Sequence, residues 1–155
     1  MPDSRIPDLA MVLDTRAGLK PRGPGPLERY ERVAAERPLW LKALFTELRK
    51  RKRIIDRMEG DEVAEKWTEL NFVHTFGFNW EVNGTSDKVF APFMHLEMST
   101  GHPVNAGARP VISFLGEEAL IQLWDKISSS IRVRPTSAAA PAKSAPAERK
   151  PGKAS

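Results

Sequence analysis

The sequence predicts an α+β fold in which a small three-stranded antiparallel sheet packs against amphipathic helices, with disordered N- and C-terminal extensions. Three observations support this fold class. Aromatic residues alternate from Phe72 to Trp80, apolar residues recur at helical spacing in 38–58 and 116–131, and both ends of the chain are rich in proline or alanine. A hydrophobic content of 41% provides enough apolar surface for one core, so we expect a single globular domain over residues 27–131.

The two ends of the chain are expected to lie outside this domain. Residues 1–26 carry five prolines and end in a Pro-Gly alternation, which predicts an irregular proline-rich arm because proline interrupts both helices and strand ladders. Residues 132–155 form a basic tail of Ala, Pro and Lys with little to bury, which predicts disorder.

The spacing of apolar residues predicts the helices. The longest rests on apolar residues separated by three, four, seven and three positions between Leu41 and Met58. Gly60 and Asp61 indicate where that helix ends and the next begins, since glycine favours a helix C-terminus and aspartate an N-cap. We therefore expect four helices, over residues 27–36, 38–58, 61–69 and 116–131.

The strands are predicted by β-forming residues and by a turn signal. The alternating aromatics are interpreted as one buried face of a strand, and Asn83-Gly84 favours a hairpin because both residues tolerate positive φ. Pro92 cannot donate to a ladder, which favours an edge or a bulge for the returning strand. We expect three strands, over residues 71–82, 88–99 and 111–115.

Charge is distributed unevenly along the chain. Residues 37–57 hold eight basic and two acidic residues, whereas residues 58–100 hold two basic and eight acidic ones. Five consecutive cations on one helix would repel each other, and a polyanion would relieve that repulsion. The leading hypothesis is therefore a non-enzymatic accessory or regulatory protein that binds nucleic acid non-specifically through a basic helix and the tail. Its candidate contact residues are Arg49, Lys50, Arg51, Lys52, Arg53, Arg57, Arg132 and Arg134.

Two alternatives stay open beside nucleic-acid binding. The first is a protein-binding module, an inhibitor or an assembly factor, that acts on one protein target through the proline-rich arm and exposed aromatics. The second is a small metal-dependent enzyme that uses His74 and His95, if the hairpin brings them together on adjacent strands. The basic run could also pair with the acidic stretch from Glu59 to Glu69, within the chain or across a homodimer.

The remaining expectations concern cofactors and location. The chain has no cysteine, which excludes disulfides and thiolate ligands, and no phosphate loop or nucleophile motif is present, so we expect no cofactor. No signal peptide and no apolar run of the length of a membrane span is visible, which favours a cytoplasmic protein.

Overall fold

The computed structural model describes residues 9–17, 23–86, 91–101 and 112–133. In this part of the chain, five antiparallel strands form one sheet in the order β1-β5-β4-β3-β2. The elements in chain order are β1 (Leu9–Arg16), α1 (Pro26–Glu36), α2 (Leu39–Lys42), β2 (Phe45–Ile55), β3 (Met58–Thr68), β4 (His74–Val82), β5 (Phe93–Thr100) and α3 (Glu117–Ser130). The α+β class is confirmed, and the prediction of a three-stranded sheet is wrong.

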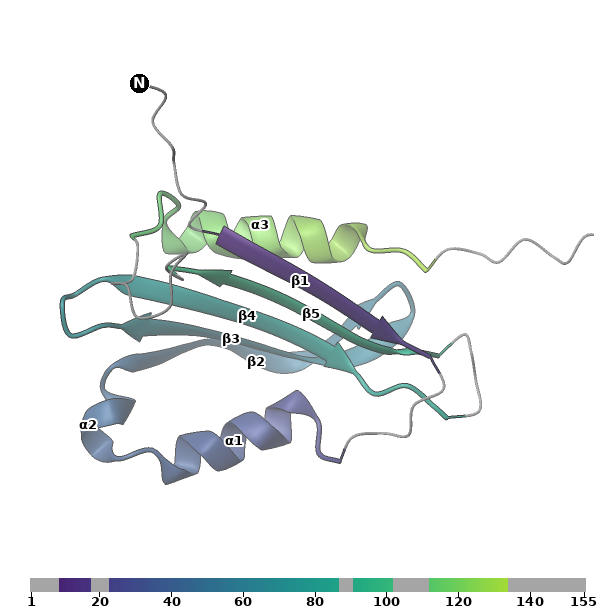
Figure 1. Ribbon diagram of the computed structural model, residues 1–155, viewed down its shortest axis with the longest axis horizontal. Coiled ribbons are helices and arrows are strands. Elements are labelled where there is room, and N and C mark those ends of the chain that lie inside the picture. The colour runs from purple at the N-terminus through teal and green to yellow at the C-terminus, as the bar shows by residue number, and fades with distance from the viewer. Residues whose placement is uncertain (1–8, 18–22, 87–90, 102–111, 134–155) are drawn as a thin grey trace, which may run out of the picture.

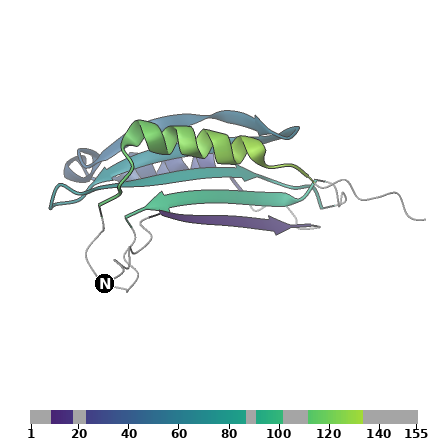
Figure 2. The same cartoon turned by 90° about the horizontal axis from the view of Figure 1, so that it is seen from above.

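The sheet lies between helices on both of its faces. Helix α3 covers one face, and α1 and α2 lie on the other (Figure 1). The view onto α3 shows β1 and β2 at opposite edges of the sheet (Figure 2). None of the described helices is both long enough and apolar enough to cross a membrane.

The main core fills the space between α3 and the sheet. Phe78 and Trp80 of β4 are almost fully buried there, as are Leu120 and Trp124 of α3. The rings of Phe78 and Trp124 stack with their centroids 5.6 Å apart. These contacts confirm the expected strand with one aromatic face and the closing helix, because both patterns place apolar residues on one side of their element.

The predicted helices over 38–58 and 61–69 are wrong. Most of this stretch forms the hairpin of β2 and β3, whose turn is Asp56-Arg57 with φ angles of 44° and 70°. Two successive positive φ angles are the geometry of a tight two-residue hairpin. The tight turn places residues of opposite charge across from each other, so pairing between strands outweighs the apolar spacing that suggested a helix.

The N-terminal arm and the returning strand also differ from expectation. Residues 9–16 are not irregular, because they form β1 and pair along the whole of β5. The prolines of the arm lie outside this stretch, so they do not interrupt its ladder. The returning strand, β5, is an interior strand and not an edge strand. Pro92 does not interrupt its ladder, because it precedes the first residue of β5.

Two further expectations concern segments near the C-terminal half. The strand expected over 111–115 is not formed within 112–115, and residue 111 lies outside the described part. The predicted disordered tail also lies outside it, apart from residues 132 and 133.

A first helix over 27–36 is confirmed as α1.

Replacing Gly60 with alanine is expected to lower the free energy of unfolding by about 2 kcal/mol, within the usual range for overpacking. An added Cβ would lie 2.6 Å from the Glu81 carbonyl oxygen and 2.6 Å from the Trp80 ring, and neither can move freely. Urea denaturation measures the change. Gly77→Ala is the matched control, since a Cβ there meets nothing within 4 Å, and an equal loss in both variants would contradict the prediction.

Candidate functional site

The basic run lies on strand β2 at an edge of the sheet, so the predicted basic helix does not exist. Side chains alternate along a strand, and the register of β2 with β3 divides the run between the two faces. Arg49, Arg51 and Arg53 lie on the face that α3 covers, and Lys50 and Lys52 lie on the face that carries α1. The cations are therefore not gathered on one exposed surface.

Glu62 of β3 binds two of the arginines of the run, beneath α3. Its side chain is fully buried, and Arg51 and Arg53 donate to its two carboxylate oxygens. The indole Nε1 of Trp124 donates to the same carboxylate at 2.6 Å. Burial raises the pKa of Glu62, but these hydrogen bonds outweigh it, so that the pKa lies below its ordinary value. Glu62 is accordingly a charged and fully bonded part of the core.

The other cations of the run also meet carboxylates. Arg49 donates two hydrogen bonds to Asp125 of α3, at 2.6 and 2.8 Å, and this pairing lowers the pKa of Asp125. The lysines pair on the opposite face, Lys50 with Glu31 and Lys52 with Asp61. Lys50, Arg51 and Lys52 are exposed, but each cation of the run pairs with a carboxylate, so the self-repulsion that favoured a polyanion is already relieved and nucleic-acid contact by this run is unsupported.

Two of the remaining predicted contact residues lie at the turn between β2 and β3, because the backbone N–H of Val133 donates to Asp56 at 2.6 Å. Arg57 is exposed in the hairpin turn, and Arg132 donates to the carbonyl oxygens of Ser129 and Ile131 after α3. Arg134 lies outside the described residues. The hydroxyl of Ser129 accepts from Arg53 at 3.1 Å, so Arg132 also lies close to the run on β2.

The two histidines of the metal hypothesis lie at opposite ends of the sheet. His74 is the first residue of β4 and contacts Thr68 of β3 at 3.1 Å. His95 of β5 pairs with Glu81, seven residues further along β4, a separation of about 23 Å in an extended strand. The hairpin therefore does not assemble a site from these two residues.

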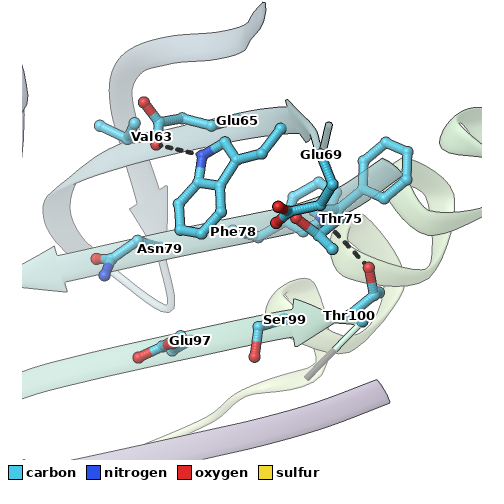
Figure 3. Close-up of a pocket in the computed structure, with 13 residues that line it drawn as sticks. Val63, Glu65, Glu69, Thr75, Phe78, Asn79, Glu97, Ser99 and Thr100 are labelled. Carbon is cyan, nitrogen blue, oxygen red and sulfur yellow. Dashed lines mark hydrogen bonds between the residues drawn. The ribbon is translucent and has the colours of Figure 1, made fainter. Parts of the chain in front are cut away.

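A surface hollow of about 370 Å³ lies on the face that carries α1, over β3, β4 and β5 (Figure 3). We call it the sheet hollow. Among the residues that the structure describes, its lining contains three acidic side chains and no basic one. The lining residues are Val63, Glu65, Trp67, Glu69, Thr75, Phe76, Gly77, Phe78, Asn79, Glu97, Ser99, Thr100 and Gly101.

The hollow exists because a glycine occupies the middle of its floor. Gly77 pairs with Glu65 on β3 and with Ser99 on β5, so these two side chains stand on either side of a position without one. Two strand spacings separate them, about 10 Å. A Cβ on Gly77 would meet nothing within 4 Å, which leaves the space above it open.

Two polar atoms of the hollow have no partner. Among the residues that the structure describes, the buried side-chain oxygens without a hydrogen bond are Thr75 Oγ1 and Asn79 Oδ1, and both residues line the hollow. Thr75 is 7% exposed. A buried polar group without a partner is unfavourable by about 1–3 kcal/mol, so two of them in one hollow indicate a functional surface.

Helix α1 is held beside the hollow by carboxylates of the sheet. Arg29 binds Glu81 through two hydrogen bonds, at 3.1 and 2.8 Å. Arg37, which follows the helix, pairs with Glu65 at 3.2 Å and lies over the ring of Phe45. These contacts hold α1 over β3 and β4, and no helix of the described part of the chain covers the β5 side of the same face.

The fold and this surface can be compared with known proteins. The family described as "Tle cognate immunity protein 4 C-terminal domain" matches residues 3–136. The chain belongs to this family. No curated protein matches it closely enough to count as a relative.

Solved structures of immunity proteins share the fold of this family member. The immunity protein TplEi of the T6SS from Pseudomonas aeruginosa, complexed with the "L" peptide, is 25% identical with a TM-score of 0.70. A chain of the Tle4–Tli4 complex is 26% identical, again with a TM-score of 0.70. Each match covers 84% of this chain, but only 44% and 42% of the respective solved chains. The immunity-family chain therefore spans less than half the length of the proteins it resembles.

Sequence reasoning missed the sheet hollow of this immunity-family chain. Gly77 falls within the strand expected over residues 71–82, where the sequence assigns it no role. The signal that could have indicated the hollow is a glycine inside a strand, which often marks a close approach by a ligand or another backbone. The partners of Gly77 were not predictable, because they depend on the register of three strands.

Proposed function

We propose that this chain binds one protein partner, an effector of the Tle type, and blocks it without catalysing a reaction. The observation that carries the proposal is the match to the Tle immunity family over residues 3–136. The shared fold with a chain of the Tle4–Tli4 complex supports it, since that structure contains an immunity protein bound to its partner. This is the protein-binding alternative of the sequence analysis, in its form as an inhibitor.

The sheet hollow supplies a surface suited to that role. A specific protein interface needs a concave or complementary patch in which polar groups of the partner find hydrogen bonds. The hollow combines free acceptor atoms with the partly exposed ring of Trp67. We therefore place the contact with the effector on the α1 face, beside α1 and over β5.

The proposal is tested by mixing the chain with the Tle-type effector of its source strain. We expect one stable complex in size-exclusion chromatography, saturable binding in calorimetry, and loss of the effector's activity when the chain is equimolar. The Tle4 effector of the solved complex is the non-cognate comparison and should bind more weakly. Separate elution of the chain and the cognate effector, with full effector activity, would overturn the proposal.

A further inference from the structure

Among the side-chain groups of the sheet hollow, Asn79 Oδ1 and the Glu97 carboxylate can only accept hydrogen bonds, whereas the Thr75 and Ser99 hydroxyls can accept or donate. Thr75 Oγ1 and Asn79 Oδ1 lack partners among the described residues, and the Glu97 carboxylate has no hydrogen bond or ion pair with any of them. The amide nitrogen of Asn79 is already engaged, because it lies 2.9 Å from His95 Nε2. Because Asn79 Oδ1 and the Glu97 carboxylate can only accept, a ligand that satisfies both of them must donate.

The unpaired charge of the hollow is negative. Glu65 is satisfied by Arg37 and by the indole N–H of Trp67, which lies 3.1 Å from its carboxylate. Glu97 stands on β5, whereas the arginines that bind α1 to the sheet pair with Glu81 of β4 and Glu65 of β3. Figure 3 shows Glu97, Ser99 and Asn79 together on the two adjacent strands that form this side of the hollow. Glu97 therefore supplies a carboxylate that no described cation pairs with, on the strand next to Asn79.

The shape of the hollow favours a planar cation. Trp67 lines it and remains 36% exposed, so a guanidinium can stack on the indole while its edge donates to the acceptors. Guanidinium carries five donors in a fixed plane, whereas an ammonium is a compact and more strongly hydrated charge. The backbones of Glu65 and Ser99 lie about 10 Å apart, and this distance leaves room for a guanidinium group.

We propose that the sheet hollow binds an arginine side chain of the partner protein, with the guanidinium held by Glu97 and by Asn79, its direct neighbour on β4, and stacked on Trp67. This inference rests on the proposed function for the identity of the partner as a protein. Its chemistry rests on the hollow alone, so it can be tested without the effector.

Methylguanidinium is the probe. It is titrated into the isolated chain, and ¹⁵N-resolved NMR follows the chemical shifts. We expect saturable shifts confined to the hollow, at Gly77, Asn79 and Ser99, with affinity on the order of millimolar for so small a ligand. N-methylurea, which has a similar shape and no charge, should cause no saturable shift. Methylammonium should bind several-fold more weakly.

Two variants and a control connect the shifts to the hollow. Glu97→Gln should weaken methylguanidinium about tenfold, because it removes a charge-assisted hydrogen bond. Thr75→Val keeps the shape of the side chain and should leave the affinity nearly unchanged, because Thr75 lies four residues, about 13 Å, from Asn79 along β4. Glu118→Gln removes the same charge from exposed α3 and should change nothing.

Several results would overturn the inference. Shifts spread over the whole surface, equal binding of N-methylurea, or unchanged binding in Glu97→Gln would exclude a guanidinium site. Equal binding of methylammonium would exclude arginine as the preferred residue. If methylguanidinium binds as expected and the effector does not, the guanidinium site stands and only the proposed function is contradicted.

Discussion

Replacing Glu62 with glutamine is expected to lower the free energy of unfolding by about 3 kcal/mol, the lower end of the range for breaking a buried ion pair. Glu62 is fully buried and accepts hydrogen bonds from Arg51, Arg53 and Trp124. Glutamine keeps the size of the side chain but leaves the arginine charges without a full partner. The loss stays near the lower limit because Asp125 still pairs with Arg53, at 3.3 Å.

Urea denaturation of Glu62→Gln and of the unchanged chain measures this loss, with exposed Glu118→Gln as the control. The pKa of Glu62 is lowered in the fold, so its contribution is complete above the unfolded value of about 4.3 and is lost as pH falls through the folded pKa. The difference between the two proteins should therefore narrow in acid. A difference below 1 kcal/mol at neutral pH, or one that is constant with pH, would contradict the role assigned to Glu62.

The same residues explain why the fold was only partly predictable. Apolar spacing suggested one helix through the basic run, and nothing in that spacing excluded a strand. The deciding interactions lie between strands, since Arg51 pairs with Glu62 and Lys52 with Asp61 only once the turn at Asp56-Arg57 has formed. Arginine is an unusual residue for positive φ, so the turn gave little signal.

Elements with a one-sided apolar pattern were predictable. Helix α3 and strand β4 each bury one face against the other, and local spacing determines which residues lie there. Strand β1 was not predictable, because its position depends on β5 and its neighbourhood is rich in proline. The sheet hollow was even less predictable, because it depends on the register of three strands around Gly77.

Replacing Gly77 with arginine is expected to weaken effector binding by about 100-fold, the effect of losing a central interface contact. The new side chain would fill the hollow from below and place a guanidinium beside Glu97, where we propose that the partner's arginine binds. Stability should not fall. A Cβ at this position has open space, and glycine within a strand is less favourable than other residues by about 0.5–1 kcal/mol.

Calorimetry with the Tle-type effector measures the affinity, and urea denaturation of the same samples measures the stability. Gly77→Ala leaves most of the hollow open and should bind nearly as the unchanged chain does. Gly116→Arg adds the same charge before α3, where a Cβ also meets nothing within 4 Å, and separates the filling of the hollow from a change in net charge. If folded Gly77→Arg binds the effector with unchanged affinity, the effector contacts another face of the sheet. A loss shared equally with Gly116→Arg would instead make long-range charge the cause, because only the variant at Gly77 obstructs the hollow.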